Sequence, residues 1–256
     1  MAATTIDTAE LRKFQRSFAH DDWPEPSCPI CGKGKLVLTD DHLRIEQAGN
    51  SASRASIKAQ ESSPFDISGA FHAALHCNHK DCGDWVTATG DFFVDQEYDA
   101  KGDWEWKDHL RVRTMYPPID ILTIPDNTPK LVAAELRRAA GVTWLDPNSA
   151  VTALRTALER LMDDQMVKKM SNLHNRIEHY RTTDNEKFGT LLLAVKYVGN
   201  GGAHITDPAV APTTSKDVID MAEFIGIVIK GLYDPDDHSD ALSRAERINT
   251  AGKLVD

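Results

Sequence analysis

The four cysteines of this chain come in two close pairs. Two residues separate Cys28 from Cys31 and four separate Cys77 from Cys82, and a glycine follows the second cysteine of each pair. This spacing lets two thiolates point at one ion from a tight turn, and the glycine supplies the positive φ angle that such a turn requires. Paired cysteines in a cytoplasmic chain of this size favour a metal over disulfides. The pattern therefore predicts that Cys28, Cys31, Cys77 and Cys82 bind one zinc ion.

Four thiolates close the tetrahedral coordination sphere of zinc and leave no position for water, so the zinc is expected to be structural and not catalytic. Its binding free energy, on the order of 10 kcal/mol in isolated modules, would hold together a β module with little core of its own. Two alternatives remain. Either His76 or His79 replaces one thiolate, or the four cysteines are reduced and unrelated.

The composition changes at Tyr116-Pro117-Pro118 and divides the chain into two predicted domains. Residues 1–115 are expected to form a helix over 7–19 and a zinc-ribbon β module, and residues 116–256 a helical domain. The fold class is therefore α+β. The polar stretch 46–66 is predicted to be a mobile loop inserted in the ribbon. Alternation and β-forming composition predict strands at 35–39, 71–76, 85–89, 92–98 and 104–115.

Everything beyond the connector is predicted to be helical, in a bundle of about five helices. Pro129 follows Thr128 and Pro147 follows Asp146, and a capping residue followed by proline marks the first turn of a helix. The fourth helix is expected to stop at Gly199, since consecutive glycines do not easily sustain a helix. The predicted helices cover 129–141, 147–161, 171–181, 186–198 and 218–233. The last is apolar nearly all round and is expected to be central.

The formal net charge of −10 tells against a generic nucleic-acid coat, which needs a positive surface for phosphate contacts. No apolar run approaches the ~20 residues that a membrane span needs. The first residues form no apolar signal core and have the pattern of an amphipathic helix. We therefore expect a cytoplasmic protein with no membrane partner.

Aromatic residues gather at the end of the first predicted domain. Trp104, Trp106 and Tyr116 could form a surface on which nucleic-acid bases stack. Aromatic residues two apart more often form one buried face of a sheet, and the acidic neighbours Asp103 and Glu105 would repel phosphate. A buried sheet face is therefore expected.

The helical half resembles a known family. The segments that carry the resemblance are YPPIDILTIPDNTPKLVAAELRRAA, ALRTALERLM, LHNRIEHY and VKYVGNGGAHI. They are similar to the domain of unknown function 4145, over about residues 116–233, and a two-knuckle zinc ribbon often precedes that domain. The family is found in or beside restriction and other phage-defence proteins. It looks like a distant branch of the HEPN superfamily, whose helical domains dimerise and often act as metal-independent ribonucleases.

The resemblance implies a candidate catalytic site. Active HEPN domains carry an Arg, commonly an Asn directly after it, and a His shortly beyond. Two such motifs meet across the dimer, where His and Arg position a ribose 2′-OH and stabilise the charge that develops on the phosphate. Asn200 and His204 match this pattern, but Gly199 stands in the place of the Arg. The nearest upstream cation is Lys196, which has seven residues between it and His204, more than the usual spacing, and which lacks the planar fork of Arg.

The candidate catalytic residues are therefore His204, Asn200 and Lys196. His204 could act as a general base, since an unperturbed histidine titrates near neutrality. The alternative is a histidine that caps the carbonyls at a helix end, and a Lys196 that is an exposed helix lysine.

Arg155 and Glu159 are four residues apart on one predicted helix, so their side chains lie on the same face. Arg before Glu is the less favourable order for an ion pair on an isolated helix. The pair is therefore expected to serve the bundle interior or the domain interface, and a ligand-binding pair is the alternative.

These observations predict a zinc-binding accessory protein associated with phage defence or restriction. It would bind protein, RNA or DNA through its HEPN-like helical domain, as a homodimer or with a partner protein. The alternative is a metal-independent HEPN-type endoribonuclease with a dimer-interface site around His204. A third interpretation is a regulatory partner whose acidic surface occupies another protein's nucleic-acid site.

Overall fold

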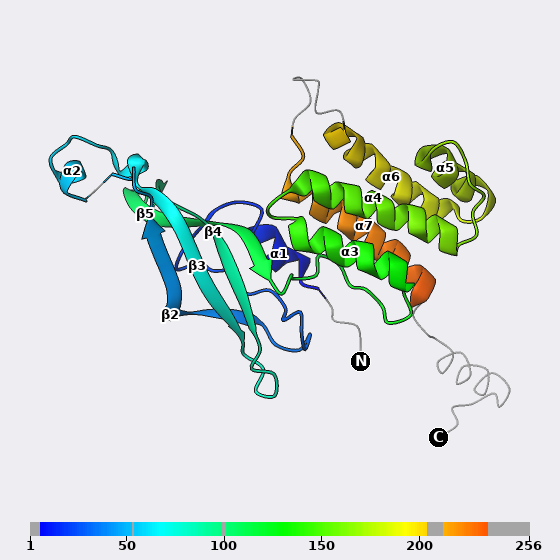
Figure 1. Ribbon diagram of the computed structural model, residues 1–256, viewed down its shortest axis with the longest axis horizontal. Helices are drawn as coiled ribbons and strands as arrows, with labels where there is room; N and C mark the ends of the chain where they lie inside the picture. The colour runs from blue at the N-terminus through cyan, green and yellow to red at the C-terminus, as the bar shows by residue number, and fades with distance from the viewer. Residues whose placement is uncertain (1–5, 53, 99–100, 204–211, 235–256) are drawn as a thin grey trace.

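The structure, a computed structural model, describes residues 6–52, 54–98, 101–203 and 212–234. The fold is mixed α+β, as predicted: an N-terminal curled antiparallel sheet is followed by packed helices. Figure 1 shows the sheet on one side of the molecule and the helices on the other. In the described ranges, no helix is long and apolar enough to cross a membrane.

The sheet is larger than the ribbon predicted from the sequence. Its strands are β1 (Phe18–Ala19), β2 (Leu36–Gln47), β3 (Ser68–Cys77), β4 (Trp85–Tyr98) and β5 (Trp104–Tyr116). Their order is β1-β5-β4-β3-β2, and every neighbouring pair is antiparallel. The strands β2 to β5 are 10 to 14 residues long, so the sheet extends far beyond the cysteine pairs.

The two strands predicted at 85–89 and 92–98 form the single strand β4. The register against β5 shifts between Thr89 and Gly90. A Cβ atom on Gly90 would collide with the carbonyl oxygen of Arg111 and with the ring of Phe71. Glycine is therefore required where β5 and a core ring approach the backbone closely, and the strand continues through the irregularity.

The stretch 46–66 is not a loop throughout. It contains the end of β2, the short helix α2 (Arg54–Lys58) and the 3-10 turn η1 (Pro64–Asp66). The turn has a capping box, in which Ser63 accepts from the N–H of Phe65 and Asp66 accepts from the N–H of Ser63. The low apolar content hid these local signals, and the mobility of the stretch stays a prediction.

The first helix, α1 (Thr8–Lys13), is shorter than the predicted 7–19. Phe14 and Phe18 are buried as their spacing suggested, but Phe18 belongs to β1. Their rings pack edge to face at 5.7 Å, and both also contact Trp23. Two buried residues four apart therefore do not need a helix here, because a turn brings the same rings together.

Five helices follow in the described residues, the number predicted. They are α3 (Lys130–Val142), α4 (Pro147–Asp164), α5 (Leu173–Thr183), α6 (Glu186–Ala203) and α7 (Ser215–Tyr233). Side chains of Asp146, Asn172 and Thr214 accept backbone N–H groups at the starts of α4, α5 and α7. The cap at Asp146 was predicted from the sequence. The cap predicted at Thr128 is wrong, because α3 begins at Lys130 after Pro129 and no side chain caps it.

Two helix predictions are wrong. The fourth helix was expected to stop at Gly199, and α6 continues to Ala203. Adding a residue to an existing helix gains a hydrogen bond, so a glycine cost of about 1 kcal/mol does not end it. The helix α7 was expected to be central, but it has an exposed side that includes Glu223 and Lys230. The central helix is α4, which contacts α3, α5, α6 and α7.

The sheet and the helices share a core. Buried residues of the sheet, such as Phe71 and Leu110, lie in one cluster with Trp144, which follows α3, and with Ile219 of α7. Arg12 of α1 adds ion pairs at 2.6 Å to Asp220 and at 2.8 Å to Glu223, both on α7. The division into domains 1–115 and 116–256 stays a prediction, while the packing across residue 115 is continuous.

The cap of α4 gives a pH-dependent prediction. The hydroxyl and N–H of Ser149 hydrogen bond to the Asp146 carboxylate and lower its pKa. A lowered pKa stabilises the fold above the unfolded pKa, and the stability is lost as the pH falls through the folded pKa. Asp146→Ala should therefore cost about 1 kcal/mol at pH 7, and less as the pH falls below about 4.

Urea unfolding at several pH values measures this difference. Lys168→Ala, at an exposed position of the loop after α4, is the matched control and should stay within about 0.5 kcal/mol of the wild type. A cost of Asp146→Ala that is constant from pH 7 to pH 3 would contradict the role of its charge.

Candidate metal centre

The first cysteine pair lies on a tight turn before β2. The N–H of Cys28 donates to the carbonyl oxygen of Gly34, and the N–H of Gly32 donates to that of Cys28, both at 2.9 Å. Gly32 has a φ of 64°, as the sequence predicted for the residue after the second cysteine. The sulfur of Cys31 accepts the N–H of Lys33 at 3.4 Å. The backbone thus aims both sulfurs to one side of the turn.

The second pair lies on the turn between β3 and β4. The strand β3 ends at Cys77, whose N–H donates to the carbonyl oxygen of Asp84 at 2.9 Å. The N–H of Cys82 donates to the carbonyl oxygen of His79 at 3.0 Å, and Gly83 has a φ of 67°. The second knuckle therefore repeats the plan of the first with a longer turn.

Backbone contacts hold the two knuckles together. The N–H of Lys35 donates to the side-chain oxygen of Asn78 at 2.9 Å, and the N–H of Asn78 donates back to the carbonyl oxygen of Lys35 at 3.0 Å. A Cβ atom on Gly34 would lie 2.5 Å from the sulfur of Cys77. The absence of a side chain at Gly34 therefore lets the first turn approach the second cysteine pair.

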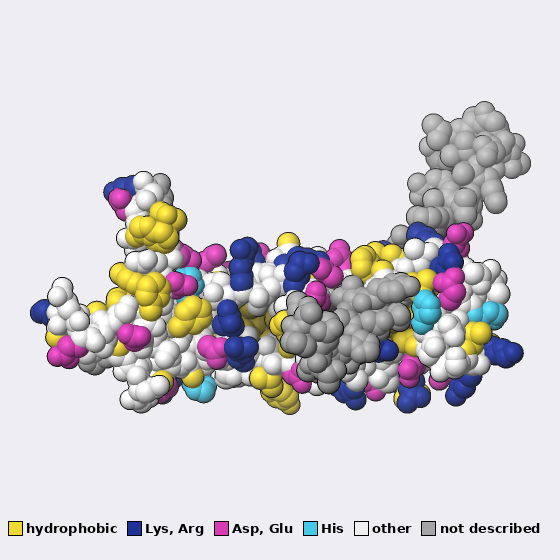
Figure 2. Space-filling model, turned by 90° about the horizontal axis from the view of Figure 1, so that it is seen from above, with side chains coloured by type: hydrophobic (Ala, Val, Ile, Leu, Met, Phe, Trp, Pro, Cys, Tyr) yellow, Lys and Arg dark blue, Asp and Glu magenta, His cyan; other side chains and the backbone are white. Residues whose placement is uncertain are grey.

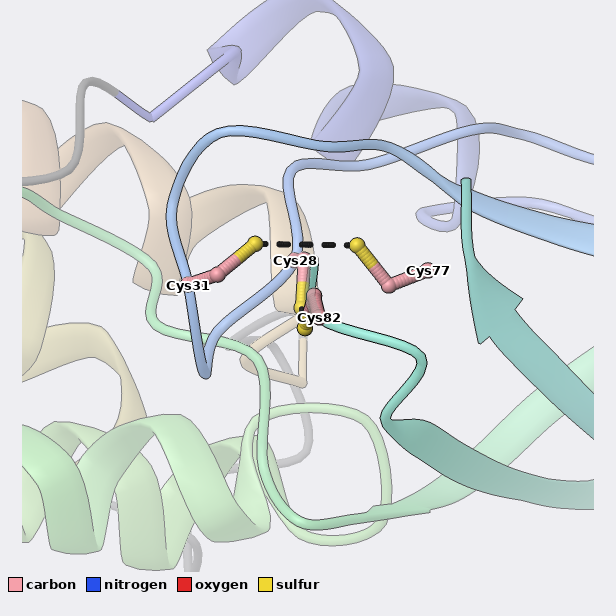
Figure 3. A group of neighbouring side chains, drawn as sticks. All are labelled: Cys28, Cys31, Cys77 and Cys82. Atoms are coloured by element: carbon pink, nitrogen blue, oxygen red, sulfur yellow. Dashed lines mark hydrogen bonds between the residues drawn. The ribbon is translucent and has the colours of Figure 1, made fainter. Parts of the chain in front are cut away.

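The four cysteine side chains converge on one point (Figure 3). The sulfurs of Cys28 and Cys82 are 3.9 Å apart, those of Cys31 and Cys77 are 3.6 Å apart, and all four lie within 4.8 Å of one another. Zinc–sulfur bonds of about 2.3 Å in a tetrahedron require sulfurs about 3.8 Å apart. The four cysteines can therefore hold one metal ion, and their thiolates suit zinc.

The thiols differ in acidity. Burial raises the pKa of Cys31, but the hydrogen bonds from the N–H groups of Lys33 and Gly34 have the larger effect. The pKa of this thiol is therefore lowered to about 6. The N–H of Asp84 lowers the pKa of Cys82, but burial and the neighbouring cysteines raise it to about 12. Without a cation, one thiolate therefore discourages the ionisation of another. A bound metal ion would remove this repulsion.

The histidine alternatives are not favoured by the geometry. The ring of His76 packs at 5.3 Å from that of Trp85, and Nδ1 of His79 accepts the N–H of Asp81 at 3.4 Å. In the part of the chain that the structure describes, the four cysteines are the only group of metal-ligating side chains that lie this close together. None of the four forms a disulfide.

The candidate catalytic residues belong to the end of α6 and beyond. The backbones of Lys196 and Asn200 lie in α6, one helical turn apart. His204 lies outside the described residues. The roles of His204, Asn200 and Lys196 therefore stay predictions.

Arg155 and Glu159 both lie on α4. Arg155 is half-buried and Glu159 is exposed, so Glu159 does not lie in the bundle interior, one of the two expected places for this pair. The other, the domain interface, stays a prediction. Glu159 lines a polar hollow of about 370 Å³ between α4 and α5, together with Asp163, Lys169 and other residues. Arg155 does not line it. A ligand-binding role for the two residues stays a prediction.

The sequence interpretation missed Arg176, although it lies within the LHNRIEHY segment. Its side chain is buried at the inner wall of the hollow. The guanidinium donates to the carbonyl oxygens of Val167, at 2.6 and 3.2 Å, and of Glu159, at 3.4 Å, and pairs with Asp163 at 2.8 Å. Arg176 thus ties the end of α4 and the following loop to α5. One signal in the sequence could have identified it. Arg176 lies on the same face of the predicted helix as Leu173, Ile177 and Tyr180, which were expected to point inward.

The predicted aromatic face is also corrected. Trp104 and Trp106 are exposed, not buried. Tyr116 is exposed at the opposite end of β5, so the structure does not bring the three together. The alternation along β5 correctly places Trp104 and Trp106 on one face of the strand. It does not predict which part of that face other elements cover.

The fold and the cysteine cluster thus define a mixed α+β protein with a four-cysteine candidate metal centre, formed by the turn before β2 and the turn between β3 and β4. Comparison with known families finds two matches, one over the sheet and one over most of the helices. Residues 16–116 match a domain of unknown function (DUF8608), and residues 137–251 match a domain of unknown function (DUF4145). The predicted resemblance to the second family is confirmed over residues 137–251, which leaves the Tyr116-Pro117 element outside the match. No curated protein and no solved structure matches this chain.

Proposed function

We propose that this chain is a zinc-binding accessory protein that works by binding other macromolecules. The observation that carries the proposal is the convergence of four sulfurs within 4.8 Å of one another, at separations that suit tetrahedral zinc. A site closed by four thiolates leaves no open position for a substrate. The metal would therefore support the fold of the N-terminal module as a zinc ribbon does, and the function would depend on surfaces.

The helical half is proposed to supply the main binding surface. Residues 137–251 match DUF4145, and the resemblance of that family to the HEPN superfamily suggests a homodimer or a complex with a partner protein. RNA or DNA is a further candidate partner. The same resemblance suggests a role in phage defence or restriction, in the cytoplasm, where thiols stay reduced.

The alternative proposal is a metal-independent endoribonuclease with a site at a dimer interface. The order Asn200…His204 supports it, and Gly199 in the place of the expected Arg speaks against it. Lys196 would then supply the positive charge for the phosphate.

Cleavage of labelled single-stranded RNA in EDTA separates the two proposals. The binding function predicts no cleavage by the wild type or by His204→Ala. The nuclease predicts cleavage by the wild type that is reduced by about 10²-fold or more in His204→Ala, because general acid–base catalysis is lost. Equal cleavage by both proteins would count against a nuclease built on His204.

Purification of the tagged chain from its native host tests the binding function itself. The expected result is a stoichiometric second protein, a second copy of the chain or a bound nucleic acid, measured by light scattering and by the absorbance ratio. A monomer that carries no partner, with no binding to RNA or DNA at low salt, would overturn the proposal.

A further inference from the structure

Four exposed aromatic side chains gather at the end of the sheet that lies far from the helices. Phe65 is 56% exposed, Tyr98 63%, Trp104 57% and Trp106 43%. We call these four residues the aromatic tip. Figure 1 shows β5 starting at this end of the sheet, where the segment of α2 also projects. In Figure 2 hydrophobic side chains lie at this end, with both acidic and basic side chains beside them.

The rings of the aromatic tip are already in contact with one another. Tyr98 and Trp104 face each other across β4 and β5, with ring centroids 3.8 Å apart. Trp106 packs edge to face against Phe65 of η1 at 4.7 Å. Ring pairs of this kind hold the side chains in place before any partner arrives, so little conformational entropy remains to be lost on binding.

The aromatic tip continues the apolar face of the sheet. Leu110 of β5 is fully buried on the same face as Trp104 and Trp106, since residues two apart along a strand point the same way. Near Leu110 this face is covered by residues around α1 and by Trp144. The described residues leave its outer end exposed, and a monomer seldom exposes aromatic rings in a group without a use for them.

Carboxylates flank the aromatic tip. Asp66 follows Phe65, and Asp108 is exposed two residues beyond Trp106, on the same face of β5 as the two tryptophans. Glu105 lies on the opposite face, where it holds Lys107 at 2.8 Å and raises the pKa of that lysine. The carboxylates on the face of the rings are therefore Asp66 and Asp108, which repel phosphate and attract cations.

We propose that the aromatic tip binds a basic segment of a partner protein. Aromatic faces attract the guanidinium of Arg and the ammonium of Lys, and the aliphatic stems of both side chains cover apolar rings. The flanking carboxylates complement the same charges. This surface belongs to the sheet and needs neither the metal ion nor the helical half, so it goes beyond the binding function proposed above.

The test uses a short fluorescent peptide in which Arg alternates with Ala, and measures its affinity for the full chain by fluorescence anisotropy. Trp104→Ala should weaken binding by about ten-fold, as loss of an aromatic anchor does. Tyr116→Ala is the matched control, because it removes an exposed aromatic ring from the other end of the same strand, and it should leave the affinity unchanged. Both variants should keep the melting temperature of the wild type, since both rings are exposed.

The same titration includes a peptide with Glu in place of each Arg and a single-stranded RNA of similar length. The proposal expects neither to compete with the Arg peptide. Equal binding of the Arg peptide to Trp104→Ala and to the wild type would overturn it, as would competition by the RNA. If sedimentation shows a dimer that Trp104→Ala converts to a monomer, a second copy covers the aromatic tip and the proposal is wrong.

Discussion

Replacing Cys28 and Cys77 together by serine is expected to abolish zinc binding and to lower the thermal stability of the whole chain. Each serine removes a thiolate from a different knuckle, and two remaining thiolates cannot complete a tetrahedral site. Bound zinc stabilises the folded state by about 4 kcal/mol when its free concentration is 1,000-fold above the dissociation constant. Zinc content by mass spectrometry and melting by calorimetry measure the two effects.

The structure changes the expected unfolding behaviour of the protein without zinc. The sequence suggested a β module with little core of its own, held together by the zinc ion. Phe71, Leu75 and Leu110 instead build a core that continues into Trp144 and Ile219 on the helical side. We therefore expect one melting transition at a lower temperature, with hydrogen exchange fastest in the two knuckles.

Asp81→Asn is the matched control for the metal centre. Asp81 lies between Cys77 and Cys82 but belongs to no group of clustered ligands, so the variant should bind zinc like the wild type. Removing the metal from the wild-type protein with a chelator compares the melting temperatures with and without zinc, and needs no substitution. A wild-type protein that carries no zinc after growth with zinc, or one that melts at the same temperature with and without a chelator, would contradict a structural zinc ion.

Arg176→Met is expected to lower the free energy of unfolding by about 2–3 kcal/mol, because buried acceptors lose their donor. The substitution keeps an apolar stem but leaves the carbonyl oxygens of Val167 and Glu159 without the guanidinium. Asp163 also loses its cation, but its carboxylate is exposed and adds little to the cost. Urea unfolding followed by circular dichroism measures it.

Arg181→Met, on the same helix, is the matched control. Arg181 is partly exposed and pairs with Glu178 one turn away at 2.5 Å. An ion pair of this kind contributes less than about 1 kcal/mol. Similar costs for the two variants would show that Arg176 is not the link between α4 and α5 that its hydrogen bonds indicate.

The cysteine site was accessible from the sequence because its signals are local. Spacing within each pair and the glycine after it specify the turn, whatever surrounds it. The helix starts were predictable for the same reason, since Asp146 and Thr214 act on backbone groups within one turn. Ends and faces were less predictable, as α6 passing through Gly199 shows.

Other features depend on residues distant in the sequence. The partial period of two in β5 gave one face to Trp104, Trp106 and Leu110, but only the packing decides that Leu110 is covered and the two tryptophans are exposed. From the sequence alone, Arg176 would be placed on the surface of its helix. In the fold, the loop after α4 covers it, and its guanidinium donates to the carbonyl oxygen of Val167 in that loop. His204 could be proposed only by resemblance, because a catalytic role needs neighbours that a linear motif does not contain.

The sequence by itself determined that this is an α+β protein with one four-cysteine candidate metal centre and a helical half related to DUF4145. The tertiary structure decided that the sheet and the helices share one core, and that the sheet leaves its aromatic tip uncovered. The physical reason is range. Turn geometry and capping act over a few residues, whereas burial is the sum of contacts from segments far apart in the chain.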